Sequence, residues 1–115
     1  MRDYRFYLED IQSSVQKIEK FTKGLTLQKF QKDDLVIDAV IRNLEVIGEA
    51  SGNIPDKIKK KYPDIEWKKI TALRNILIHE YFGVDHEILW DIVTNKLPEL
   101  KKTINAALRA APPLL

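Results

Sequence analysis

Apolar residues recur at helical spacing along most of the chain. In residues 4–21 they follow one another at alternating steps of four and three residues, which predicts one stripe of an amphipathic helix. The members of this stripe are Tyr4, Leu8, Ile11, Val15 and Ile18. Gly24 fits a position just beyond the end of this helix, and Thr26 or Asp33 can cap the helix that follows.

The second long segment, residues 33–55, is richer in apolar residues, which cover a wide arc, as expected of a central helix. On the opposite face runs a lane of polar side chains at helical spacing: Asp38, Arg42, Glu45 and Glu49. Such a lane is typical of a solvated face carrying ion pairs one turn apart. The alternative is that Glu45 or Glu49 faces a functional site. A clear break follows at residues 51–55.

The rest of the chain predicts three further helical stretches. Residues 56–64 form a short basic helix or turn, and a third long helix runs from a cap at Asp64 to about Phe82, where Gly83 can end it. Asp85 caps the last stretch, in which Pro98 either kinks the helix or starts a new one.

No segment alternates as a strand would, and no internal repeat is visible. The pattern predicts an all-α protein, an antiparallel bundle of four or five helices joined by short loops. We expect a single domain over residues 1–111, with residues 112–115 as a frayed tail.

Composition narrows the possible functions. The 115 residues are 44% hydrophobic and 31% charged, and the net charge is only +2, so the overall charge neither requires nor excludes a nucleic-acid partner. There is no cysteine, which excludes disulfide scaffolds, cysteine zinc sites and thiol catalysis. The beginning of the chain does not resemble a signal peptide, and no apolar run is long enough for a bilayer. We expect a soluble cytoplasmic protein without a membrane partner.

Arg74 stands out because it lies in the apolar arc of the third long helix. With about 100° per residue, its neighbours on that face are apolar or aromatic. They are Trp67, Ile70, Leu77, Ile78 and Tyr81. A buried, unpaired guanidinium is very costly, so Arg74 must pair with an acid, extend to solvent or line a cleft. A structural pair with Glu45 or Glu49 is one interpretation.

His79 adds a second interpretation. It follows Arg74 near the predicted helix end, about 140° further round, and Asn75 lies one turn before it, close enough to orient an imidazole. The two side chains would not converge on one straight helix. Convergence requires either a distorted helix end or a two-fold dimer, which would bring two copies of each into one cleft. Such a cleft suits a phosphodiester, because arginine stabilises the extra negative charge and histidine moves protons near neutral pH.

These residues form a recognisable motif, Arg-x4-His-x-Tyr, in the run RNILIHEY. Further agreement comes from IGEA at residues 47–50, Trp67 before the motif, GVD at residues 83–85 and LW at residues 89–90. Over about residues 4–108 the chain resembles the HEPN superfamily, specifically the HepT-like ribonuclease toxins.

This resemblance implies a HEPN-like helical bundle that dimerises through the motif helix. It also implies a metal-independent endoribonuclease with no cofactor, in which Arg74 and His79 form the catalytic pair and Asn75 is a supporting polar residue. The partners it implies are RNA, a second copy of the chain and a minimal nucleotidyltransferase that acts as antitoxin. Tyr81 matches the tyrosine to which that partner adds AMP. Glu45 and Glu49 are further candidates for the supporting site.

Positive charge gathers just before the motif helix, at Lys57, Lys59, Lys60, Lys61, Lys68 and Lys69. These lysines either contact RNA phosphates or form a solvated basic surface balanced by nearby acids. His79 and His86 make a poor metal pair, so we expect no metal site. The alternative to a nuclease is a helical binding module for RNA, nucleotide or the nucleotidyltransferase, in which Arg74 serves as an anchor and nothing is cut.

Overall fold

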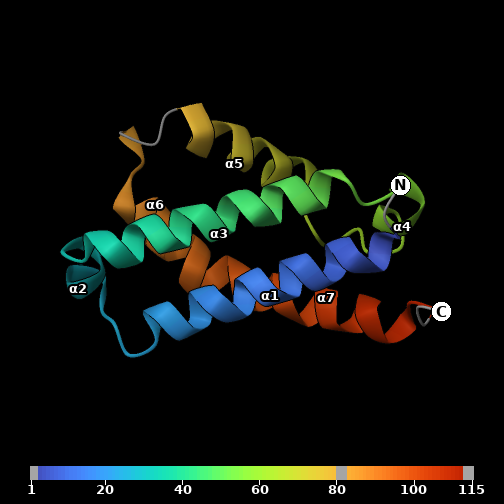
Figure 1. The fold of residues 1–115 in the computed structure, drawn as a ribbon, viewed down its shortest axis with the longest axis horizontal. Coiled ribbons are helices and arrows are strands. Elements are labelled where there is room, and N and C mark those ends of the chain that lie inside the picture. The colour runs from blue at the N-terminus through green and yellow to red at the C-terminus, as the bar shows by residue number, and fades with distance from the viewer. Residues whose placement is uncertain (1–2, 80–82, 113–115) are drawn as a thin grey trace.

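The computed structural model describes residues 3–79 and 83–112, with only the backbone at residue 79. Within those ranges the chain is helical and contains no β-strand, which confirms the predicted all-α bundle (Figure 1). The helices are α1 (Tyr4–Thr22), α2 (Leu27–Gln31), α3 (Asp34–Gly52), α4 (Asp56–Lys59), α5 (Trp67–His79), α6 (His86–Asp91) and α7 (Leu97–Ala110), with a π-helical segment, η2 (Ile92–Lys96), between the last two. Because α6, η2 and α7 follow one another without a break, they can be counted as one long helical segment beside α1, α3 and α5. The short helices α2 and α4 lie in the connections between the long segments.

Several helix starts lie at residues that the sequence offered as caps. Thr26 and Asp33 were alternatives for a single helix, and the structure uses both, because the short helix α2 precedes α3. The side chains of Thr26, Asp33 and Asp85 each accept a hydrogen bond from a backbone N–H in the first turn of α2, α3 and α6 respectively. These bonds satisfy donors that the helix itself leaves unpaired. Beyond the end of α1, Gly24 adopts a φ of 78°, the left-handed conformation that a glycine tolerates best.

The start of α5 was predicted too early. Asp64 does not cap it, because a turn closed by the Ile65 N–H donating to the Tyr62 carbonyl (3.3 Å) takes up Pro63 and Asp64. The indole N–H of Trp67 donates to the same carbonyl at 3.1 Å. These bonds hold the chain in a turn until Trp67, where the helix begins. The predicted end at Phe82 lies outside the described residues.

At Pro98 the chain begins a new α-helix, one of the two outcomes that the sequence left open. The proline lies in the first turn of α7, where its missing N–H has no partner to lose. The wider turns of η2 come directly before it, so the helical path continues from α6 into α7.

The core lies mainly between α1, α3 and α7, with α1 packed against both of the others. Fully buried members of this core include Leu8, Ile11, Val40, Ile47 and Ile104. Polar contacts join α1 to α7 at its edge. The Arg5 guanidinium donates to the carbonyls of Leu108 (3.2 Å) and Ala111 (3.4 Å), satisfying the end of α7.

Helix α5 lies on the outer side of α3, at the edge of the bundle (Figure 1). Its main packing partner among the described residues is α3, and it makes no comparable contact with α1 or α7. On its side away from α3, Lys69, Ala72 and Ile76 are exposed, and half of the Ile76 side chain is in solvent. The helix that carries the motif therefore has one packed side and one open side.

Candidate active site

A glycine lets the two helices of the site approach closely. Gly48 of α3 faces Arg74 of α5, and a Cβ at this glycine would overlap the Cβ of Arg74 and lie 3.0 Å from the Ile70 carbonyl oxygen. Only a residue without a side chain fits there. Gly48 thereby brings the base of the Arg74 side chain against the backbone of α3.

The Arg74 guanidinium is held at two points. Its Nη2 pairs with Oε2 of Glu49 on α3 at 2.9 Å, and its Nη1 donates to Oδ1 of Asn75 at 3.2 Å. The Arg74 side chain stays 37% exposed and that of Glu49 60% exposed. The arginine is thus paired with an acid, as one interpretation of the sequence predicted, and it is also accessible from the groove beside it.

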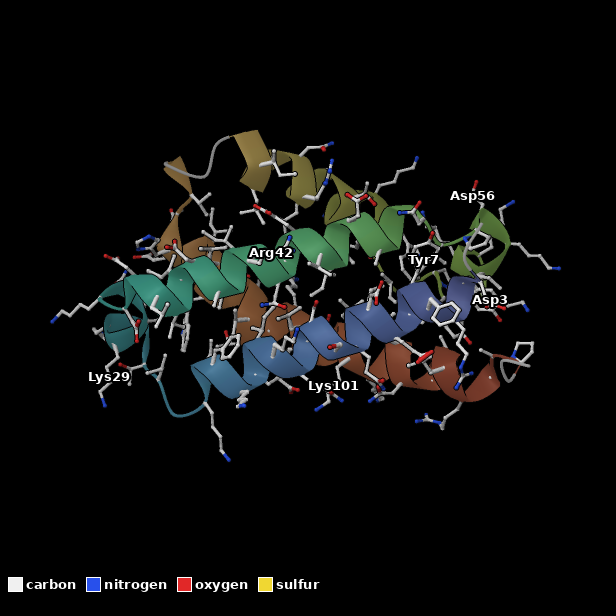
Figure 2. The ribbon with its side chains drawn as sticks, in the orientation of Figure 1. Asp3, Tyr7, Lys29, Arg42, Asp56 and Lys101 are labelled. Carbon is white, nitrogen blue, oxygen red and sulfur yellow. The ribbon has the colours of Figure 1, made fainter. Side chains whose placement is uncertain are left out.

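A groove of about 410 Å³ lies beside this pair. Three members of the polar lane of α3 line it, Arg42, Glu45 and Glu49, while Arg74 and Ile78 contribute from α5. The remaining lining residues are Tyr7, Asp10, Val46, Ala50 and Asn53. Figure 2 shows Arg42 midway along α3 and Tyr7 near the start of α1. We call this hollow the arginine groove; Asp38, the fourth residue of the lane, is exposed and does not line it.

A second, larger groove of about 880 Å³ lies between α4 and the first turns of α5. Four of the six predicted lysines line it: Lys59, Lys60, Lys68 and Lys69. Asn75, the acceptor of the Arg74 hydrogen bond, also lines this second groove. We call it the lysine groove. Lys57 and Lys61 are exposed and are not among its lining residues.

One lysine of this groove is already paired. Lys69 Nζ lies 2.8 Å from Glu66 Oε2, one turn earlier on the chain. The hydrogen bond and the charge of Lys69 lower the pKa of Glu66, and the same bond and the carboxylate raise the pKa of Lys69. Both groups are therefore charged near neutral pH, and they partly neutralise each other.

The structure brings together Arg74, Asn75, Glu49 and Glu45. His79 is the last residue of α5, and its side chain lies outside the description, as does all of Tyr81. Sequence reasoning did not identify Gly48, Arg42, Tyr7 and Asp10 as parts of the site. A small residue within the apolar arc of α3 was the available signal for Gly48.

Within residues 3–79 and 83–112, no group of three or more metal-ligating side chains converges. The same residues form no helix long and apolar enough to cross a bilayer.

The fold and the site define a helical bundle in which a partly exposed arginine, Arg74, lines one groove and its neighbour Asn75 lines another. Both lie on α5, on which the Arg-x4-His-x-Tyr motif begins. The sequence model of the family described as "Ribonuclease HepT-like" matches residues 11–107. The chain therefore belongs to the HepT-like family, as its sequence motifs predicted.

Relatives with assigned descriptions agree with this placement. A protein of Methanocaldococcus jannaschii described as a putative RNase is 45% identical over 108 residues, which cover 94% of this chain and 89% of the relative. A protein of Thermococcus cleftensis described as a probable ribonuclease HepT is 45% identical over 87% of this chain and 91% of its own. A putative RNase of Caldanaerobacter subterraneus is 38% identical, covering 95% of this chain and 97% of the relative. No solved structure gives a significant match.

Proposed function

We propose that this chain is a metal-independent endoribonuclease, the toxin of a toxin–antitoxin pair. The observation that carries the proposal is the fixed but accessible guanidinium of Arg74, five residues before the histidine that ends α5. Membership of a family described as ribonucleases supports the choice of RNA as substrate.

The proposed reaction uses the 2′-hydroxyl of the RNA as its nucleophile. The 2′-oxygen attacks the adjacent phosphorus while an imidazole of His79 takes its proton. The bond from phosphorus to the 5′-oxygen breaks, and that oxygen receives a proton from the second His79 of a dimer. The products are a 2′,3′-cyclic phosphate and a 5′-hydroxyl. Arg74 stabilises the charge on the non-bridging oxygens at the transition state.

A homodimer completes this site. On an ideal helix His79 lies about 140° round from Arg74, so one copy does not aim both groups at one phosphate. A two-fold pairing through the open side of α5 supplies the second arginine and histidine. The exposed Ile76, which lies away from the arginine groove, provides apolar surface for such a contact.

The proposed control is AMP addition by a minimal nucleotidyltransferase antitoxin. The hydroxyl oxygen of Tyr81 attacks the α-phosphorus of ATP, the phenolic proton is lost and pyrophosphate leaves. The new phosphate puts negative charge and bulk beside the catalytic pair, which blocks RNA or neutralises Arg74.

The second candidate is a binding module that holds RNA, nucleotide or the nucleotidyltransferase without cutting. The ion pair between Arg74 and Glu49 favours it, because the same contact serves a purely structural anchor.

Cleavage of end-labelled total RNA in EDTA separates the two candidates. Mass spectrometry first establishes that the preparation carries no AMP, and His79→Ala serves as the control. We expect wild-type protein to leave cyclic-phosphate ends and the variant to lose activity by at least 100-fold, the usual contribution of general acid–base catalysis. DNA of the same sequence should stay intact because it lacks the 2′-hydroxyl.

Two results would contradict the proposal. One is unmodified protein that cuts no RNA, and the other is a His79→Ala variant that cuts equally well. Either result would favour the binding module over the ribonuclease. For the antitoxin step, AMP found only on residues other than Tyr81, with activity still lost, overturns the role of that tyrosine.

A further inference from the structure

The two grooves beside Arg74 differ in charge. The arginine groove is lined by two arginines and three carboxylates. The lysine groove is lined by four lysines against two carboxylates, Asp56 and Glu66, a balance of +2. A polyanionic strand is attracted to a groove lined mainly by cations and gains affinity by releasing counterions there. The lysine groove is therefore the better path for the RNA backbone.

The lysine groove also leads towards the reacting phosphate. Lys68, Thr71, Ala72 and Asn75 all line it, and their spacing of three, four and seven residues puts them on one face of α5. Asn75, at the far end of this face, accepts the hydrogen bond from Arg74. Seven residues span about 10 Å of helix, which corresponds to roughly three nucleotides of a stacked strand at 3.4 Å each.

The lining of the lysine groove combines buried apolar side chains with exposed lysines. Its inner part is apolar, with Ile65 and Trp67 mostly buried, and its rim carries the lysines. The Trp67 indole N–H already donates to the Tyr62 carbonyl, which fixes the ring within the fold. These two side chains thus form a fixed base beneath the groove, and the groups that the groove offers to a strand are the lysine ammonium groups, which can contact its phosphates.

We propose that the lysine groove holds the stretch of RNA on one side of the scissile phosphate, with Lys59, Lys60 and Lys68 contacting its backbone phosphates. The inference rests on the proposed ribonuclease function for its choice of RNA as ligand. Lys69 contributes less than its three neighbours because Glu66 holds it at 2.8 Å.

The nucleotidyltransferase partner is the other possible occupant of the lysine groove, and the geometry of α5 disfavours it. The nucleotidyltransferase must reach Tyr81, which follows His79 at the C-terminal end of α5, whereas the lysines surround its N-terminal end. The eleven residues from Lys68 to His79 span about 16 Å.

The test uses a 12-nucleotide RNA in which every 2′-hydroxyl is methylated, so that it cannot be cut by its own 2′-oxygen. Its affinity is measured by fluorescence anisotropy over a series of KCl concentrations. One variant combines Lys59→Gln, Lys60→Gln and Lys68→Gln. A matched control removes the same charge elsewhere, with Lys20→Gln, Lys23→Gln and Lys29→Gln; Figure 2 shows Lys29 at the opposite end of the molecule from Asp56.

We expect the groove variant to bind at least tenfold more weakly than wild type in about 0.1 M KCl. The slope of log K against log salt should fall by about 2, as expected for the loss of three phosphate contacts on a single strand. The control variant should keep both the affinity and the slope. Glu66→Gln should tighten binding two- to threefold, because it frees Lys69.

Equal affinity and equal slope in the groove and control variants overturn the proposal. The same holds if the groove variant binds RNA normally but no longer accepts AMP, since the groove then docks the protein partner. Because the probe is not cleaved, a protein with no nuclease activity still gives a clear binding result. Conversely, normal cleavage of ordinary RNA by the groove variant removes only the lysine path and leaves the ribonuclease assignment in place.

Discussion

Arg74 combines two properties that seldom occur together, orientation and access. Glu49 and Asn75 hold its two terminal nitrogens, yet more than a third of the side chain remains in solvent. An ion pair this exposed contributes at most about 1 kcal/mol to stability, so the contact is worth more for geometry than for folding. The need to orient Arg74 explains one member of the polar lane on α3, Glu49.

Glu49→Gln should separate these two effects. We expect the free energy of unfolding, from urea titration, to change by less than about 1 kcal/mol. The kcat for RNA cleavage should fall about tenfold or more with little change in KM, because a small displacement of a positioned group weakens transition-state stabilisation.

Glu45→Gln is the matched comparison, since Glu45 lines the same groove without pairing with Arg74. An equal loss of kcat in both variants would show that the total charge of the groove matters, and that the individual pair does not.

At the scale of helices, the contact between α3 and α5 depends on Gly48. Ile47 and Ala50, close to it on the same helix, are buried core residues that hold α3 in register with the bundle. Because the glycine has no side chain, α5 approaches until Arg74 reaches Glu49. The distance between these two helices thus sets the position of the candidate catalytic group.

Gly48→Ala should therefore destabilise the protein. Alanine favours a helix by about 1 kcal/mol over glycine, but the new methyl group meets Arg74 and the Ile70 carbonyl, and overpacking of this kind costs about 1–3 kcal/mol. We expect a net loss of about 1 kcal/mol in urea-induced unfolding, together with reduced cleavage.

The control for that change is Gly52→Ala, one turn later on the same helix. There a Cβ would lie 3.6 Å from the Thr71 side chain, an ordinary contact, so stability should be unchanged or slightly increased. If Gly48→Ala is as stable as Gly52→Ala, the close approach of the two helices does not limit this fold.

At this same scale, the sequence predicted much of the architecture. The caps at Thr26, Asp33 and Asp85 were readable because each is a short polar side chain just before a periodic apolar segment. Asp64 has the same local appearance, yet it lies in a turn tied by Trp67 and Tyr62. The short polar side chain alone does not separate these cases, because the Tyr62 carbonyl accepts from both the Ile65 N–H and the Trp67 indole and so keeps Asp64 in a turn.

For the whole molecule, the position of α5 at the edge of the bundle is the main feature of the candidate site. A helix packed chiefly on one neighbour, with Ile76 exposed on its other side, leaves apolar surface that a second copy could cover. The proposed catalytic cleft requires such a pairing, since one copy supplies only one arginine and one histidine from the motif.

Ile76→Glu should disrupt this proposed dimer, because it would bury a charge in the contact. We expect wild-type protein to sediment as a dimer at micromolar concentration, and the variant to sediment as a monomer with little RNA cleavage.

Ile88→Glu is the control, since Ile88 of α6 is similarly exposed, at 58%, and lies on a different helix. Wild-type protein that is monomeric and fully active would overturn the composite cleft.

The sequence alone determined the helices, most of their ends, the all-α class and the family. These features depend on the spacing of side chains along the chain and on short motifs, which local physical chemistry reads directly. Tertiary structure alone decided that Glu49 pairs with Arg74, that Gly48 permits the contact, and that Arg74 and Asn75 line two separate grooves of different charge. Those facts depend on which faces of separate helices meet. That choice is made by packing the whole core, because many residues far apart in the chain must be buried together.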